Sequence, residues 1–176
     1  FEVTTPDGVR LYAWHFPAEP GQPARLPIVM LHGWIEVKEF HFGRARALSQ
    51  RGHDVILFDH RGHGRSDAAP ASFGVSEQRD LRAVLDAAQQ RGIVKDRVIT
   101  MGFSMGAATC LQHAADDARV AAVVAFAPFV DLREAISSFR EKLASRVSDR
   151  WVMGGFERAA AEAGYDVVCF TEALEH

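Results

Sequence analysis

Short apolar runs alternate with amphipathic segments along most of the chain. Such runs are typical of strands buried on both faces of a sheet, and four occur, at Ile28–Leu31, Val55–Phe58, Val98–Met101 and Val120–Phe126. Between them, apolar residues recur at spacings of three and four over residues 81–88 and 107–111, which predicts helices. The alternation predicts an α/β fold with a mostly parallel sheet and helices on both faces.

The two ends of the chain depart from this alternation. The β-rich runs Phe1–Thr5 and Val9–Trp14 flank the turn signal Pro6-Asp7-Gly8, which predicts an N-terminal β-hairpin. After Asp131 the apolar spacing predicts helices, and a short strand follows. We therefore divide the chain into a core over residues 1–131, a helical cap-like segment over 132–164, and a strand with a tail over 165–176 that ends in Leu-Glu-His, like the scar before a vector-encoded histidine tag.

The composition is that of an ordinary globular protein, with 48% hydrophobic and 24% charged residues. A net charge of -3 with scattered basic residues gives no basis for binding nucleic acid or an anionic membrane surface. Cys110 and Cys169 lack the spacing of a disulfide framework or a zinc site, so we expect a reducing, cytoplasmic location. The most apolar run, residues 120–130, is too short to cross a bilayer, and a signal or anchor upstream of Phe1 is left open.

The strongest chemical signal is a G-x-S-x-G motif, formed by Gly102-Phe103-Ser104-Met105-Gly106 between a predicted strand and a predicted helix. A serine in so tight a turn needs glycine two residues away on either side, because larger side chains would collide with the neighbouring backbone. The free N–H groups at the start of the helix favour negative charge beside Ser104. This context indicates a nucleophilic serine; the alternative is a chance glycine-rich turn with a helix-capping serine.

Two further motifs directly follow predicted strands. His32-Gly33-Trp34 comes after Ile28–Leu31, and Asp59-His60-Arg61-Gly62-His63-Gly64-Arg65-Ser66-Asp67 comes after Val55–Phe58. Together with the serine motif, and in this order, they resemble the α/β-hydrolase superfamily over residues 1–131. Within it, the pattern is most similar to the monoglyceride-lipase and serine-aminopeptidase-like branch.

The resemblance implies a role for several residues. Ser104 matches the nucleophile, and the backbone N–H groups of Trp34 and Met105 match the oxyanion hole. His32 matches a structural histidine, and the family implies neither a cofactor nor a metal. The spacing of His60, His63 and Asp59 is also compatible with a metal site, although the family turn explains the same residues. A phosphate-binding loop is disfavoured, because the third glycine and a G-K-[ST] sequence are lacking.

The family pattern breaks after the sixth strand, so we expect an incomplete α/β-hydrolase fold. A serine nucleophile needs a base and an orienting carboxylate, which the family places on later strands. Asp131 is a candidate acid, with an alternative role as the N-cap of the helix that follows it. His113 should point away from Ser104, and His176 is terminal. The base is therefore unknown.

The sequence leaves three functions open. The first is a serine hydrolase acting on a small carboxylic ester or amide through an acyl-enzyme, weakly active without its base. The second is acyl transfer, peptide cleavage or perhydrolysis at the same site. The third is a non-catalytic, oligomer-forming fragment or binding module. We also expect a homodimer, because Val120–Phe126 carries no charge or proline to protect an open sheet edge.

Overall fold

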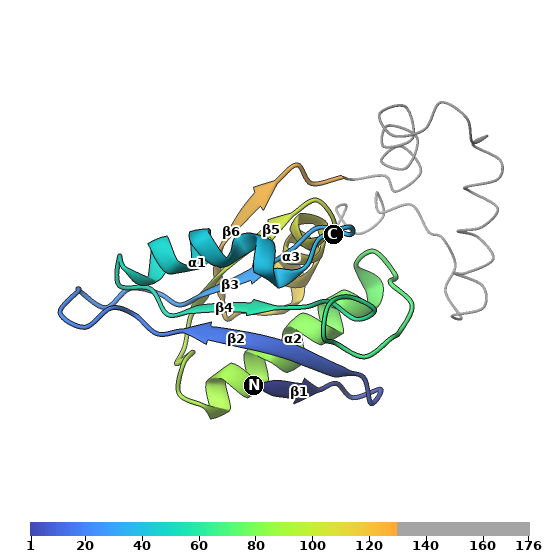
Figure 1. Cartoon of the computed structure of the whole chain (residues 1–176), viewed down its shortest axis with the longest axis horizontal. Coiled ribbons are helices and arrows are strands. Elements are labelled where there is room, and N and C mark those ends of the chain that lie inside the picture. Colours follow the sequence, from blue (N-terminus) through green and yellow to red (C-terminus); the bar gives the residue numbers. More distant parts are fainter. Residues whose placement is uncertain (130–176) are drawn as a thin grey trace. The chain divides into compact units, whose positions relative to one another are not determined.

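A mixed six-stranded sheet is the centre of the computed structural model, which describes residues 1–129 (Figure 1). Its strands are β1 (Glu2–Thr4), β2 (Arg10–Phe16), β3 (Ile28–Leu31), β4 (Val55–Phe58), β5 (Val98–Phe103) and β6 (Val120–Phe126), in the order β1-β2-β4-β3-β5-β6. β1 and β2 form an antiparallel hairpin, and β2 is antiparallel to β4. The pairs β3–β4, β3–β5 and β5–β6 are parallel. Both the mostly parallel sheet and the N-terminal hairpin are confirmed.

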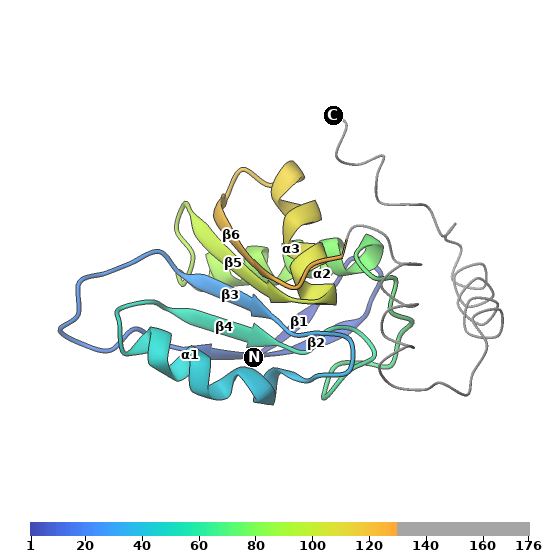
Figure 2. The same cartoon turned by 90° about the horizontal axis from the view of Figure 1, so that it is seen from above.

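Helices cover both faces of this sheet, as predicted. The short 3-10 helix η1 (Lys38–His41) leads into α1 (Phe42–Ser49) on one face, while α2 (Val75–Gln90) and α3 (Met105–Asp116) lie on the other (Figure 2). The sequence pattern missed η1 and α1. The reason is that α1 has only eight residues, of which Ala45 alone is buried, so its apolar stripe is too weak to detect.

Alternation along the strands builds two separate core layers. Ile56 and Phe58 pack with Leu81 and Leu85 of α2 on one face of the sheet. Their neighbours Val55 and Leu57 point to the opposite face and pack with Ala45 of α1. Every side chain of β3 and β4 is buried, which explains why these strands are apolar throughout.

The parallel arrangement brings three chemically important loops to one edge of the sheet. The loops that follow β3, β4 and β5 all leave from the carboxyl ends of adjacent parallel strands, where ligands bind in open α/β sheets. These are the loops that carry the three motifs. Residues 1–128 form one compact unit. The predicted segments 132–164 and 165–176 lie outside the described residues.

Within the described part of the chain, none of the helices is both long and apolar enough to span a membrane.

Candidate active site

Ser104 occupies a strained turn between β5 and α3. Its backbone angles are φ 49° and ψ -112°, in the left-handed half of conformational space that residues other than glycine seldom adopt. Its N–H donates to the carbonyl of Phe126 at 2.9 Å, and its carbonyl accepts from the N–H of Ala108 at 3.0 Å. These bonds hold the strained residue from both sides, and its side chain is exposed.

The flanking glycines are required by close backbone contacts. A Cβ atom on Gly102 would lie 2.2 Å from the carbonyl oxygen of Gly106. A Cβ atom on Gly106 would lie 2.6 Å from the carbonyl oxygen of Leu31 and 2.7 Å from that of His32. The second contact shows that the start of α3 packs directly against the end of β3. The turn, which we call the elbow (residues 102–106), is therefore adjacent to the His32-Gly33-Trp34 loop.

The elbow leaves a helix N-terminus available beside Ser104. Met105 is the first residue of α3, and its N–H has no hydrogen-bond acceptor within residues 1–129. The partial positive charge at this end of the twelve-residue helix favours an anion here. Trp34 is 42% exposed, and its ring lies 5.4 Å from that of Phe73. The structure thus brings Ser104, Met105 and the Trp34 loop together, whereas Asp131 lies outside the described residues.

His32 has a defined tautomer that explains its position. The backbone N–H of His60 donates to its Nε2 at 3.0 Å, so Nε2 is the unprotonated nitrogen. Nδ1 consequently carries the proton and donates to the carbonyl of Gly33 at 2.7 Å. Burial lowers the pKa of His32 to about 4, which keeps the ring neutral. With both nitrogens engaged, His32 orients the loop, as the family resemblance implied.

Glu36 is a site residue that sequence reasoning missed. Its carboxylate accepts the N–H of Gly33 at 2.8 Å and contacts Nε2 of His41 at 3.2 Å. Burial alone would raise the pKa of Glu36, but these two hydrogen bonds outweigh it and the pKa is lowered. The only signal in the sequence was an acidic residue three positions after a glycine, where a side chain can close a turn on a backbone N–H.

The turn after β4, which we call the β4 turn (residues 59–67), is built around the buried carboxylate of Asp59. This carboxylate accepts the backbone N–H groups of Lys38 and Arg65, each at 3.0 Å. It also accepts Nζ of Lys38 at 2.6 Å, although the lysine side chain is fully buried. A Cβ atom on Gly64 would come within 2.3 Å of the same carboxylate. Asp59 is therefore fully occupied by protein donors.

Arg61 and Ser66 of the β4 turn are also paired, whereas both nitrogens of the buried His60 ring have no hydrogen-bond partner within residues 1–129. Arg61 donates two hydrogen bonds to Asp80 of α2, at 2.7 and 2.6 Å, and further ones to Asp7. Ser66 donates to the carbonyl of Asp59 at 2.7 Å and accepts the N–H of Tyr12 at 2.9 Å. The D-x-R-G-x-G-x-S pattern is thus a structural unit that ties the hairpin, β4 and α2 together.

The histidines around this turn do not assemble a metal site. His63 contacts the carbonyl of Arg61 at 2.8 Å with one ring nitrogen and the carbonyl of Trp34 with the other. The His60 ring is buried 4.6 Å from that of His32, and burial keeps its pKa well below the usual value. Across residues 1–129, no cluster of His, Cys, Asp or Glu is arranged to hold a metal ion.

His113 lies on α3 and is committed elsewhere. Its Nε2 is 3.1 Å from the carboxylate of Asp117, just beyond the far end of the helix, and the ring is buried. This agrees with the expectation that it points away from Ser104.

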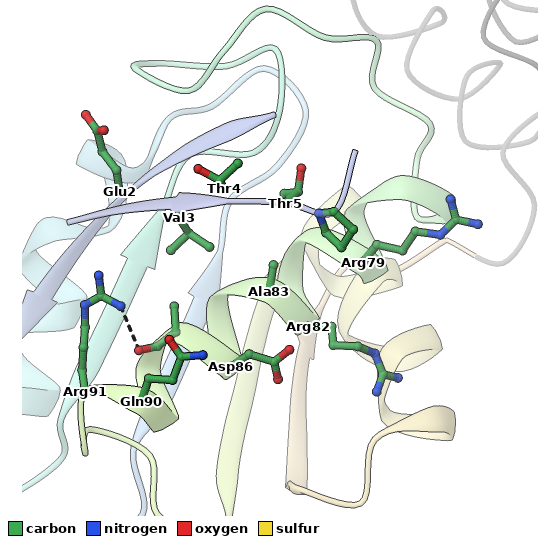
Figure 3. Close-up of a pocket in the computed structure, with 12 residues that line it drawn as sticks. Glu2, Val3, Thr4, Thr5, Arg79, Arg82, Ala83, Asp86, Gln90 and Arg91 are labelled. Carbon is green, nitrogen blue, oxygen red and sulfur yellow. Dashed lines mark hydrogen bonds between the residues drawn. The ribbon is translucent and has the colours of Figure 1, made fainter. Parts of the chain in front are cut away.

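A hollow lies between β1 and α2 (Figure 3). This open groove has a volume of about 530 Å³, and the side chains around it include Glu2, Thr5, Arg79, Arg82, Ala83 and Asp86. Arg82 and Asp86 are already engaged, with Asp117 and Arg119 respectively. None of the candidate site residues lines this groove.

Comparisons with known proteins agree with this geometry. A family profile described as the alpha/beta hydrolase fold matches residues 27–166. The thiohydrolase aneE of Aspergillus aculeatus is 31% identical over 147 residues, which cover 81% of this chain and 43% of that protein. The polyketide transferase grgF of a Penicillium species is 32% identical over 135 residues, covering 74% of this chain and 45% of the relative. The chain thus spans less than half the length of these relatives.

Solved structures show the same likeness. The Pyrococcus furiosus esterase Pf2001 has a TM-score of 0.72 and 25% identity, covering 92% of this chain and 59% of that one. The alpha/beta hydrolase GrgF from Penicillium has a TM-score of 0.69 and 26% identity, covering 94% of this chain and 55% of that one. These comparisons do not distinguish the monoglyceride-lipase branch from others.

Proposed function

Because this chain belongs to the α/β-hydrolase family, we propose that it carries the nucleophile and oxyanion hole of a serine hydrolase acting on carboxylic esters. The observation that supports this most directly is the elbow. Ser104 is exposed, held in a strained conformation, and placed at the N-terminus of α3. A purely structural serine would gain nothing from this strain, whereas a nucleophile gains access to substrate.

In this proposal, Oγ of Ser104 attacks the ester carbonyl carbon. The N–H groups of Met105 and Trp34 donate to the oxyanion that forms, and the C–O bond to the alcohol then breaks. A base takes the proton of Ser104 and delivers it to the departing alcohol, and water releases the acyl group by the reverse route. His32 and His113 are engaged in structural hydrogen bonds, so neither is assigned as the base. Asp131 as the acid remains a prediction.

The test is the hydrolysis of 4-nitrophenyl butyrate by the chain and by Ser104→Ala. We expect the variant to lose the enzymatic turnover completely, and a fluorophosphonate to label the peptide that contains Ser104. Turnover should be far below that of an intact esterase, because no histidine in residues 1–129 is hydrogen-bonded to the hydroxyl of Ser104 and the base is unassigned. Undiminished turnover in Ser104→Ala would refute the nucleophile. The absence of both turnover and labelling would favour the non-catalytic alternative.

Acyl transfer at the same serine is the second candidate. It is favoured by the relative named as a polyketide transferase, while the relative named as a thiohydrolase points to thioesters as acyl donors. Both reactions share the acyl-enzyme and differ in the acceptor that attacks it. Adding a primary alcohol to the ester assay separates them, since a transferase forms the new ester in preference to the free acid.

We further propose self-association through β6, which lies at the end of the sheet among the described strands. Its sequence has neither charge nor proline, and the backbone groups on its outer side favour pairing with another strand. Light scattering coupled to size exclusion is the test. A dimer at micromolar concentration is expected, and a monodisperse monomer would refute the proposal.

A further inference from the structure

The loop that carries the proposed oxyanion donor is closed by one carboxylate. The N–H of Gly33 donates to Oε2 of Glu36 at 2.8 Å, and the N–H of Glu36 donates back to the carbonyl of Gly33 at 3.2 Å. Trp34 lies between the two residues, inside the turn that these bonds close. The direction of its N–H therefore depends on where the Glu36 carboxylate is held.

His41 holds that carboxylate, and its tautomer follows from its neighbours. A guanidinium can only donate, and Nη1 of Arg44 lies 3.2 Å from Nδ1 of His41, so Nδ1 is the acceptor. Nε2 then carries the proton and donates to Oε2 of Glu36 at 3.2 Å. Burial lowers the pKa of His41, which favours this neutral form. Gly33 and His41 thus both donate to Glu36, and Arg44 in turn donates to His41.

The same histidine also contacts the residue beside the nucleophile. The His41 ring stacks on Phe103 with a centroid distance of 4.3 Å and an interplanar angle of 20°. Phe103 directly precedes Ser104 and stacks in turn on Phe126 at 4.8 Å. The Arg44 guanidinium lies 5.1 Å from the centre of the Phe103 ring. The His41 side chain therefore contacts both Glu36, which closes the Trp34 loop, and Phe103 at the start of the elbow.

We infer that Glu36 is a positioning residue for the oxyanion hole, held in place by His41. It acts by fixing the Gly33 N–H, which sets the orientation of the neighbouring Trp34 N–H towards the site of negative charge. This inference rests on the proposed function of Ser104. A carboxylate that only stabilised the fold would affect unfolding, whereas one that orients an oxyanion donor affects the chemical step.

The kinetic test compares Glu36→Ala, Glu36→Gln and His41→Phe, using the ester turnover that depends on Ser104. Losing one oxyanion donor lowers kcat by about a hundredfold or more, so we expect Glu36→Ala to lower kcat by about ten- to a hundredfold with KM within about twofold. The amide oxygen of Gln accepts the same N–H, so Glu36→Gln should recover kcat to within about threefold of the original. His41→Phe keeps the stacking on Phe103 and should cause an intermediate loss. Glu19→Ala, at an exposed glutamate outside the Trp34 loop, is the control.

A second readout separates this inference from the proposed function. The amide hydrogen of Gly33 should exchange with solvent at least about tenfold faster in Glu36→Ala than in Glu36→Gln, measured by NMR, because its acceptor is removed. If the chain and Ser104→Ala turn over ester equally, the proposed function fails, and the exchange rates alone then decide whether Glu36 holds the loop. An unchanged kcat or unchanged exchange in Glu36→Ala would overturn the inference. If Glu36→Ala does not fold, the same comparison is made with His41→Phe.

Discussion

The elbow and the β4 turn are both glycine-rich turns at the carboxyl ends of sheet strands, yet their polar groups are paired within the protein to different extents. In the β4 turn, the side chains of Asp59, Arg61 and Ser66 are each paired within the protein. In the elbow, Ser104 is exposed and the N–H of Met105 has no acceptor among residues 1–129. Strain also differs, because Ser104 has a positive φ without being glycine.

This difference distinguishes a structural turn from a candidate catalytic turn more clearly than the sequence motifs do. Both turns contain spaced glycines, and both match family patterns. Polar groups that pair with one another contribute stability, whereas an unpaired donor beside a strained, accessible hydroxyl is costly unless a ligand uses it. Substitutions in the β4 turn should therefore change stability, and substitutions at the elbow should mainly change activity.

The largest stability effect is expected from Asp59→Ala. Within residues 1–129 it would leave the fully buried ammonium of Lys38 with one ion-pair partner, Glu39, which is 2.8 Å away and partly exposed, beside the rings of Tyr12 and Trp14. Removing one member of a buried ion pair costs about 3–5 kcal/mol. Asp67→Ala removes an exposed ion pair with Arg10 from the same turn and should cost about 1 kcal/mol or less. Urea unfolding of both variants measures the contrast, and equal losses would contradict it.

Acid should destabilise the folded protein through its buried histidines. The pKa of His32 is about 4 in the folded state against an ordinary value of 6.5, so the unfolded chain binds more protons between these values. The free energy of unfolding should fall as the pH drops from about 6.5 to 4, by about 3 kcal/mol from this residue. Burial lowers the pKa of His41 and of His60 as well, in the same direction.

The carboxylate of Asp7 acts in a separate pH range. The pKa of Asp7, lowered to about 2 chiefly by Arg61, contributes stability that is lost only as the pH falls below about 3.8. Urea titrations at pH 7, 6, 5 and 4.5 therefore measure the histidine effect above the range in which Asp7 titrates, with Asp80, whose pKa is raised by burial, acting in the opposite direction. A free energy of unfolding that does not change between pH 7 and 4.5 would contradict the prediction.

A pair of glycine substitutions tests the geometry of the elbow. Gly102→Ala places a methyl group 2.2 Å from the Gly106 carbonyl oxygen, and such overpacking costs about 1–3 kcal/mol. Gly43→Ala lies in α1 with no atom within 4 Å of the added methyl, and should stabilise the protein by about 0.5–1 kcal/mol. Thermal unfolding measures both. Gly102→Ala should also abolish fluorophosphonate labelling, and retention of full stability and labelling would show that the elbow tolerates a side chain.

The smallest changes in stability are expected from two serine substitutions, one at a hydrogen-bonded hydroxyl and one at an exposed hydroxyl. Ser66→Ala removes two hydrogen bonds from the β4 turn and should cost about 1–2 kcal/mol. Ser104→Ala removes an exposed hydroxyl without a partner in residues 1–129, and should change stability by less than about 0.5 kcal/mol. The order of the two unfolding free energies is the test, and the reverse order would contradict the comparison.

The sequence predicted those features that depend on local pattern. The buried runs that became β3 and β4 were located to the residue, since both faces are covered and the signal is continuous. The elbow was found because its sterics involve only residues 102–106 and the adjacent strand. The physical reason for the two glycines is thus confirmed, while the catalytic role of Ser104 stays a proposal.

Features that depend on contacts between loops could not be predicted in this way. Lys38 and Asp59 are 21 residues apart and meet only because β3 and β4 are parallel and end together. A lysine near the start of a helix is ordinarily solvated, so nothing in the pattern indicated that it is buried. The hydrogen bond from the Gly33 N–H to Glu36 likewise depends on where η1 places His41, and the sequence pattern did not predict η1.

The burial of Lys38 makes this side chain a natural reporter of opening motions at the strand ends. The chain has three lysines, Lys38, Lys95 and Lys142, of which Lys95 is exposed. An amine-selective acylating reagent should modify Lys95 at once and reach Lys38 only when the loops after β3 and β4 separate. The lag between the two modified peptides in a mass spectrum would therefore measure how often the loops after β3 and β4 separate.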